Sequence, residues 1–154
     1  MQTMVDGYVT DKFGSRVGIA GEAVYKNDFV SSVKNINALN IRISHSVENC
    51  SRNILNILYT KSNPSVIVAG TPGSGKTTIL RDMARLLSSG YAGQYRKISV
   101  IDERKELSSG FDIGINTDVI SSYKKANGIE MAVRTLSPQL IVCDEIGNMN
   151  EVEA

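Results

Sequence analysis

A glycine-rich stretch carries the clearest chemical signal in this 154-residue sequence. Residues 70–77 satisfy the pattern G-x-x-x-x-G-K-[ST] at every fixed position, as Gly70-Thr71-Pro72-Gly73-Ser74-Gly75-Lys76-Thr77. Glycines let the backbone curl so that the amide groups from Gly73 to Thr78 point at phosphate oxygens at a helix N-terminus. The spacing therefore predicts a nucleotide-binding P-loop.

Three side chains at the end of this loop have distinct expected roles. Lys76 would supply positive charge to the β- and γ-phosphates, and Thr77 would place its hydroxyl on Mg²⁺. Thr78 would support the α-phosphate. A purely structural glycine turn is the alternative, and the flanking strand and helix patterns argue against it. The expected nucleotide-binding residues are Gly70, Thr71, Pro72, Gly73, Ser74, Gly75, Lys76, Thr77 and Thr78.

Two apolar runs end in acidic residues. Residues 140–143 lead into Asp144 and Glu145, the pattern of a Walker B segment, in which Asp144 holds Mg²⁺ through its water shell and Glu145 polarises the attacking water. Residues 98–101 lead into Asp102 and Glu103, so Glu103 is a second candidate for positioning water. The alternative for residues 102–106 is a solvated charge cluster. The expected catalytic residues are Lys76, Glu145 and Glu103.

The surrounding periodicities predict the elements that position these residues. Residues 65–69 form a β-branched apolar run without alternation, which predicts a central parallel strand, and residues 98–101 and 140–143 predict two more. A helix is expected from residue 79 to the Ser88-Ser89-Gly90 stop, with a polar face of Arg81, Asp82 and Arg85. Another is expected near residues 124–135. The pattern predicts an α/β fold of the P-loop NTPase type.

The part before the P-loop strand carries no obvious chemistry. Residues 8–44 read as short strands separated by turns, which predicts a small antiparallel β meander. From Ser46 the period becomes helical, and residues 61–64 are expected to end that helix. We expect a β-rich region over residues 1–45 and an ATPase core over residues 46–154. The expected apolar helix face comprises Val47, Cys50, Ile54, Ile57 and Leu58.

Composition narrows the class of protein. The formal net charge is +1, so the sequence predicts no strong positive electrostatic potential that would attract nucleic acid, and direct nucleic-acid binding is not expected. No apolar run approaches the roughly 18 residues needed to cross a bilayer, which predicts a cytoplasmic chain. Cys50 and Cys143 are expected to be reduced and buried, without metal, and His45 is expected to have a surface or capping role.

With these residues in view, the sequence resembles the stage III sporulation protein AA family of endospore-forming bacteria, relatives of the type II and type IV secretion ATPases. The resemblance covers essentially all of the chain, and residues 100–107, Val-Ile-Asp-Glu-Arg-Lys-Glu-Leu, are its most specific part. The resemblance also rests on residues 16–21, 39–43, the P-loop with residues 78–82, and then residues 117–120, 124–131, 134–139 and 144–147. One departure is Ser122-Tyr123, where the family has Cys-Pro.

The resemblance implies an ATPase with a RecA-like core, hexameric, with ATP and Mg²⁺ as cofactors. It implies work on membrane-embedded sporulation channel proteins, from the cytoplasmic face of the membrane on the mother-cell side. By the same resemblance, Arg16 and Arg42 are candidates for reaching a phosphate. An alternative of a different class is a nucleotide-gated assembly module, in which ATP binding rather than turnover organises the complex.

The resemblance also predicts that the chain is an internal fragment. In related folds a later strand lies between the P-loop strand and the strand with the Walker B acids, and it would follow residue 154. Without that strand the centre of the RecA-like sheet would be missing, so we expect poor ATP hydrolysis by these 154 residues.

Overall fold

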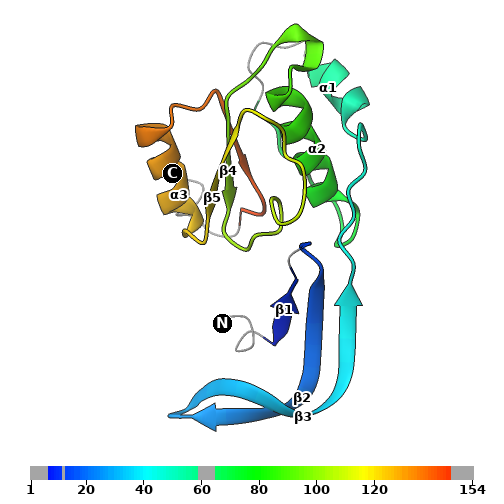
Figure 1. Ribbon diagram of the computed structural model, residues 1–154, viewed down its shortest axis with the longest axis vertical. Coiled ribbons are helices and arrows are strands. Elements are labelled where there is room, and N and C mark those ends of the chain that lie inside the picture. Colours follow the sequence, from blue (N-terminus) through cyan, green and yellow to red (C-terminus); the bar gives the residue numbers. More distant parts are fainter. Residues whose placement is uncertain (1–6, 12, 59–64, 147–154) are drawn as a thin grey trace. The chain divides into compact units, whose positions relative to one another are not determined.

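A computed structural model describes residues 7–11, 13–58 and 65–146. The chain divides into two compact units, Met1–His45 and Ser46–Ala154. The first unit holds an antiparallel sheet of order β1-β2-β3, and the second holds a separate parallel sheet of order β5-β4-β6 (Figure 1). The protein is therefore α/β, with its helices confined to the second unit over the described ranges.

The first unit is dominated by one long hairpin. Strand β1 (Tyr8–Thr10) pairs with β2 (Arg16–Lys26), which pairs along its length with β3 (Phe29–Arg42). Asn27 and Asp28 connect them with positive φ angles of 50° and 62°, as a two-residue type I′ turn requires. The expected antiparallel arrangement is confirmed, but the expectation of separate short strands was wrong. The residues treated as breaks lie inside continuous strands.

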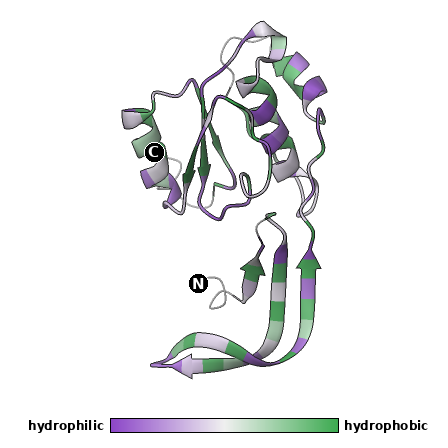
Figure 2. Cartoon of the chain, in the orientation of Figure 1, coloured by the Kyte–Doolittle hydropathy of each residue, from purple (hydrophilic) through white to green (hydrophobic). Residues whose placement is uncertain are grey.

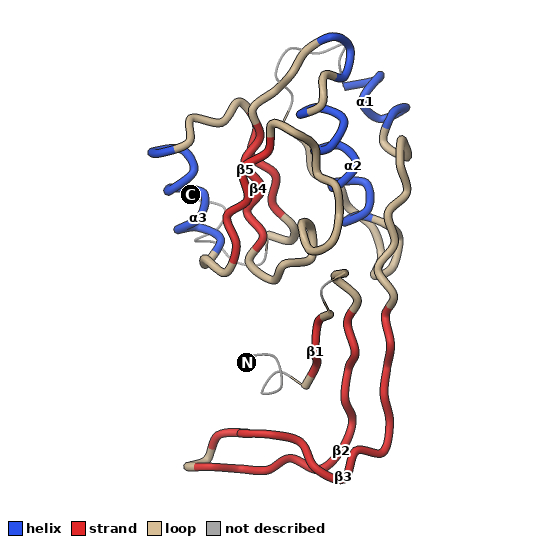
Figure 3. The backbone as a smooth tube through the Cα atoms, viewed as in Figure 1, coloured by secondary structure: helices blue, strands red, loops and turns tan. Residues whose placement is uncertain are grey.

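A bulge at Gly21 explains how the hairpin stays continuous. The register shifts between Ala20 and Glu22, and the two strands bend together along the hairpin (Figure 3). A Cβ atom at Gly21 would lie 2.7 Å from the Lys34 carbonyl oxygen and 2.8 Å from a Val33 methyl group. Only glycine fits such a close approach of two backbones, so this residue bends the strand and does not end it.

The second unit is built on β4 (Ile98–Asp102), with β5 (Thr117–Ser121) on one side and β6 (Leu140–Cys143) on the other. All three strands run in parallel, so their carboxyl ends meet at one edge. The strands expected at 98–101 and 140–143 are confirmed. Strand β5 was not expected, because its sequence Thr-Asp-Val-Ile-Ser mixes polar and apolar residues.

Helices cover both faces of this sheet. Helices α1 (Arg52–Leu58) and α2 (Lys76–Ser88) lie on one face, and α3 (Lys125–Thr135) lies on the other (Figure 1). A short 3₁₀ turn, η1 (Tyr91–Gly93), follows α2. The hydrophobic strands lie between the helix layers (Figure 2). The core on the α2 side is the larger, with Leu55, Met83, Ala84, Leu86, Leu87, Ile98, Val100, Leu107 and Val142.

The expected central strand at residues 65–69 is absent, and this is the main correction to the predicted sheet. These residues are described but form no strand, and Ile67 is 87% exposed. A strand exists only when a neighbour completes its backbone hydrogen bonds. In the described part of the chain, β6 pairs only with β4.

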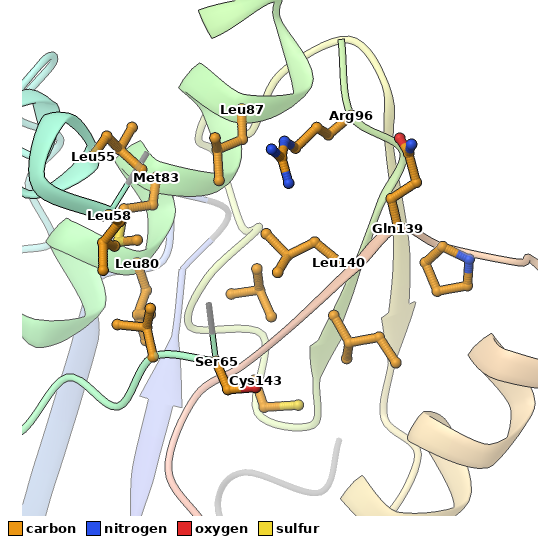
Figure 4. A pocket seen from close by; sticks show the side chains of 14 residues that line it. Leu55, Leu58, Ser65, Leu80, Met83, Leu87, Arg96, Gln139, Leu140 and Cys143 are labelled. Atoms are coloured by element: carbon orange, nitrogen blue, oxygen red, sulfur yellow. The ribbon is translucent and has the colours of Figure 1, made fainter. Parts of the chain in front are cut away.

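A pocket of about 530 Å³ lies beside β6, lined by Leu55, Met83, Leu87 and Leu140 among others (Figure 4).

The first helix also differs from its prediction. It begins at Arg52, and Val47 and Ile57 of the expected apolar face are 52% and 69% exposed. Leu55 is the residue that α1 buries. Cys50 is exposed and Cys143 half-buried, so the expectation of two buried cysteines was wrong. The expected helix end at 61–64 lies outside the described residues. No helix in the described ranges is long and apolar enough to span a bilayer.

Candidate functional site

The glycine-rich loop leads directly into the N-terminus of α2. Gly73 and Gly75 have positive φ angles of 77° and 90°, and Gly75 is the residue immediately before the helix. Both positions are open, since an added Cβ would meet nothing within 4 Å. These two residues need glycine for their backbone conformation and not for lack of space. The loop thereby turns sharply enough to present the first backbone amides of α2.

Lys76 lies across this loop. Its Nζ donates hydrogen bonds to the carbonyl oxygens of Gly70, at 3.1 Å, and Thr71, at 3.0 Å. The loop has an internal turn of its own, because the Ser74 amide donates to the Thr71 carbonyl oxygen at 3.2 Å. The ammonium group is thus held over the loop by two neutral acceptors. An anionic ligand can replace them, because it offers Lys76 a charge-assisted hydrogen bond.

Thr77 and Asp144 come together from positions 67 residues apart. The Thr77 Oγ1 atom lies 3.5 Å from each carboxylate oxygen of Asp144. Burial raises the pKa of Asp144 above its ordinary value, and the negative charges of Glu106 and Glu145 raise it further. Burial and the neighbouring carboxylates therefore disfavour ionisation of Asp144. A cation at this place would favour it.

Glu145 is held from two directions. Its carboxylate forms an ion pair with Arg104, with Nη1 and Oε2 3.2 Å apart. Its backbone carbonyl oxygen accepts a hydrogen bond from Lys125 Nζ, at the start of α3. The φ angle of Glu145 is 29°, a region that non-glycine residues rarely adopt. Glu103, the other candidate for positioning water, is exposed.

Asp102 organises the loop that follows β4. It is 1% exposed. Its carboxylate accepts hydrogen bonds from the backbone amides of Glu106, Leu107 and Ser108, and from the Ser108 hydroxyl at 2.7 Å. The alternative of a solvated charge cluster was therefore wrong for Asp102, although it describes the exposed Glu103, Arg104 and Lys105.

Arg81 fastens the same loop to α2. Its side chain donates hydrogen bonds to the carbonyl oxygens of Leu107, at 2.9 Å, and Glu106, at 2.8 Å. The guanidinium also lies over the Phe111 ring, 3.5 Å from its centroid. Burial lowers the pKa of Arg81, while Asp102 and Asp144 act to raise it. Helix α2 therefore holds the loop after β4 and directly follows the glycine loop.

The expected polar face of α2 is thus not a solvent face. Arg81 and Asp82 are 3% and 4% exposed. Asp82 accepts hydrogen bonds from the backbone amides of Asn49 and Ser51 and from the Ser51 hydroxyl, and it forms an ion pair with Arg85 at 2.7 Å. Helical periodicity alone assigns such residues to the surface, because it does not register partners elsewhere in the chain.

The structure brings together the loop, Lys76, Thr77, Asp144 and Glu145 at one end of the parallel sheet. Sequence reasoning missed Arg81, Arg104 and Lys125. The charged run at 102–106 was the available signal for Arg104, but nothing in it indicates a partner 41 residues away. Arg16 lies over the Tyr8 ring and pairs in register with Arg42. Both arginines belong to the first unit, and their expected phosphate role stays a prediction.

Metal binding by protein groups alone is not supported. Over the ranges that the structure describes, no group of three or more His, Cys, Asp or Glu side chains could hold a metal ion. Asp144 and Thr77 together offer a carboxylate and a hydroxyl. Oxygen donors of this kind suit Mg²⁺, which commonly takes one or two carboxylates and completes its shell with water and substrate phosphates.

The fold and site define an α/β protein with a glycine-rich loop at the carboxyl edge of a parallel sheet. The chain belongs to the family described as "Sporulation stage III, protein AA", which matches residues 2–154. This confirms the resemblance found in the sequence. No solved structure matches the chain significantly.

Three curated proteins illustrate the similarity. Stage III sporulation protein AA of Bacillus subtilis is 36% identical, over 96% of this chain and 50% of its own length. The uncharacterized protein ycf45 of Cyanidium caldarium is 30% identical over 61% of this chain and 29% of its own. The protein SEEDLING PLASTID DEVELOPMENT 1 of Arabidopsis thaliana is 28% identical over 81% of this chain and 19% of its own length. The chain thus spans half or less of these relatives.

Proposed function

We propose that this chain binds ATP with Mg²⁺ and hydrolyses it, and that the reaction drives a sporulation-associated secretion or channel complex. The observation that carries the proposal is the convergence of three groups at the start of α2. Lys76 lies across the glycine loop, and Thr77 faces the carboxylate of Asp144. A phosphate-binding cation, a hydroxyl and a metal-binding acid are the groups that a P-loop NTPase requires.

Each residue has a defined part in the proposed reaction. The loop amides and Lys76 hold the phosphates, and Lys76 exchanges its two carbonyl acceptors for phosphate oxygens. Thr77 and Asp144 hold Mg²⁺, which would neutralise charge on the phosphates. Glu145 orients the attacking water, with Glu103 as the second candidate. The positive charge of the metal ion would also offset the repulsion that Glu106 and Glu145 exert on the Asp144 carboxylate.

The wider setting follows from family membership and belongs to the same proposal. We infer a RecA-like core that is partial in these residues, a hexameric assembly, and membrane-embedded sporulation channel proteins as partners. The site of action would be the cytoplasmic face of the membrane on the mother-cell side. These inferences concern a whole family protein. The match to the Bacillus subtilis relative covers 50% of that relative's length.

Nucleotide affinity tests the proposal most directly. Titration calorimetry with Mg²⁺ and a non-hydrolysable ATP analogue should give binding, and Lys76→Ala should weaken it at least about tenfold, or about 1.4 kcal/mol. The matched control is Lys34→Ala, because Lys34 is exposed and forms only a surface ion pair with Glu22 at 3.7 Å. Equal affinity in the native chain and Lys76→Ala would refute a phosphate role for the loop.

The alternative, a nucleotide-gated assembly module, is favoured by one observation. Arg104 forms an ion pair with the carboxylate of Glu145, and this pairing competes with the role of orienting an attacking water molecule. If nucleotide binding alone organises the complex, Glu145→Gln should support sporulation in cells while Lys76→Ala fails. If turnover does the work, both variants should fail. Spore counts from complemented strains, with equal protein levels verified by immunoblot, separate the two functions.

A further inference from the structure

Glu145 contacts two cationic side chains at the carboxyl edge of the parallel sheet. Arg104 pairs with its carboxylate, and Lys125 donates to its backbone carbonyl. The two cations come from different elements, the loop after β4 and the start of α3. The backbone between these contacts has a φ angle of 29°. Strain of this kind persists only where the surroundings over-determine a conformation, and it is concentrated at functional and switching sites.

The backbone of the loop that carries Arg104 is held by hydrogen bonds, although the Arg104 side chain is exposed. Asp102, at the end of β4, accepts hydrogen bonds from the backbone at 106, 107 and 108. Arg81 holds the carbonyl oxygens of Glu106 and Leu107 from α2. The loop that carries Arg104 is therefore fastened to the helix that begins at the glycine loop. The exposed guanidinium of Arg104 can change rotamer, while the backbone of its loop stays attached to α2 and so to the proposed phosphate site.

The ion pair itself is of the exchangeable kind. The side chains of Arg104 and Glu145 are 60% and 65% exposed, so their attraction is screened by water and salt. The terminal phosphate of a nucleoside triphosphate carries more charge than a carboxylate and accepts two parallel hydrogen bonds from a guanidinium. Glu145 directly follows Asp144, which faces Thr77 at the glycine loop. A phosphate bound there would compete with Glu145 for Arg104.

We propose that Arg104 exchanges the carboxylate of Glu145 for the γ-phosphate of a bound nucleoside triphosphate. In the nucleotide-free state it holds Glu145 in its strained, paired conformation. With a triphosphate bound, Arg104 turns to the phosphate and leaves Glu145 able to accept a hydrogen bond from water. A diphosphate lacks the competing group, so the original pair persists. This inference rests on the proposed nucleotide site and adds to it a means of distinguishing ATP from ADP.

A double-mutant cycle on nucleotide affinity tests the exchange. Dissociation constants for Mg²⁺ with a non-hydrolysable ATP analogue, and for Mg²⁺ with ADP, are measured for the native chain, Glu145→Gln, Arg104→Ala and the double variant. Glu145→Gln removes the competitor and should tighten triphosphate binding about fivefold. In the Arg104→Ala background the same change should have less than about half that effect. Repulsion between Glu145 and the phosphate acts in both backgrounds and largely cancels from the cycle.

Two further variants separate exchange from a structural role. Arg104→Lys should recover part of the triphosphate affinity lost in Arg104→Ala, since it keeps the charge without the planar fork. Lys105→Asn is the matched control: it removes the neighbouring exposed cation, and asparagine tolerates the φ angle of 57° at that position. It should leave both dissociation constants within about twofold.

The outcomes are distinct. Additive effects of Glu145→Gln and Arg104→Ala, or equal changes in triphosphate and ADP affinity, overturn the exchange while leaving the nucleotide site intact. A change in melting temperature on Arg104→Ala without a change in the ratio of the two affinities does the same. If the native chain binds neither nucleotide, the proposed function fails first, and the exchange fails with it.

Discussion

The surroundings of Asp144 disfavour its negative charge in the nucleotide-free protein, and a bound cation would favour it. Burial raises its pKa, and Glu106 and Glu145 add like charge around it. Because the pKa in the folded chain is raised, ionisation of Asp144 lowers the stability of the folded state once the pH exceeds the unfolded pKa. The carboxylate is therefore retained at a cost in stability, which is common where a group serves binding.

Asp144→Asn should stabilise the nucleotide-free chain at pH 7, by about 1 kcal/mol, because it removes a charge that burial, Glu106 and Glu145 disfavour. The same variant should lose Mg²⁺-dependent nucleotide binding. Thermal melts with and without Mg²⁺ and nucleotide measure both effects, with Glu130→Gln, an exposed acid on α3, as the control. The gain should shrink as the pH falls toward the folded pKa of Asp144, and a lower melting temperature at pH 7 would contradict the argument.

At the scale of elements, α2 serves as the frame of the second unit. Through Lys76 and Thr77 it borders the glycine loop, through Arg81 it holds the loop after β4, and through Asp82 it holds the turn before α1. The Asp82 side chain is 3% exposed and accepts several hydrogen bonds, so its loss would leave the buried Ser51 hydroxyl and the half-buried Arg85 guanidinium without this acceptor.

Asp82→Asn should therefore destabilise the chain by about 3 kcal/mol, the usual cost of breaking a buried pair. Burial raises the pKa of Asp82, but hydrogen bonds from Ser51, Arg85 and Asn49 outweigh it, and the net pKa is lowered. A lowered pKa means that the stabilisation is complete above the unfolded pKa and is lost as the pH falls through the folded value. Urea unfolding between pH 7 and pH 3 should show the difference between native and variant shrinking in acid.

The elements that could be predicted from the sequence are those whose residues carry their own signal. Strands β4 and β6 are apolar runs, and the loop before α2 is fixed by glycines with positive φ. Prediction failed where partners decide the outcome. Residues 65–69 are as β-prone as β4 but pair with no strand among the described residues, while the mixed sequence of β5 becomes a strand because β4 lies beside it.

The candidate site divides in the same way. The glycine loop, Lys76 and Thr77 were predicted from the spacing of one motif and Asp144 from its place after an apolar run, and the structure brings Thr77 and Asp144 to 3.5 Å. The ion pair of Arg104 with Glu145 joins two segments whose proximity depends on the order of the strands. Strand order is set by packing and hydrogen bonding across the whole sheet, and no local pattern encodes it.

At the scale of the whole molecule, the two units differ in what stabilises them. Every buried hydrophobic side chain among the described residues lies between Leu55 and Val142, in the second unit. The described side chains of the first unit are all half-buried or exposed. Tyr25 and Phe29, near the hairpin turn, are 66% and 77% exposed. Backbone pairing without a covered face gives little independent stability in water.

Separate expression should therefore yield unequal units. Residues 46–154 should melt cooperatively and keep the affinity of the whole chain for nucleotide within about threefold, because the core and the glycine loop are both theirs. Residues 1–45 alone should show the circular dichroism of an unfolded chain, since three strands whose described side chains are all half-buried or exposed cannot offset the entropy of ordering about 45 residues. Tyr25→Ser and Phe29→Ser in the whole chain should leave its melting temperature nearly unchanged, because both rings are exposed. A cooperative transition in the isolated first unit, or a large destabilisation by either serine variant, would mean that its apolar side chains are covered in solution.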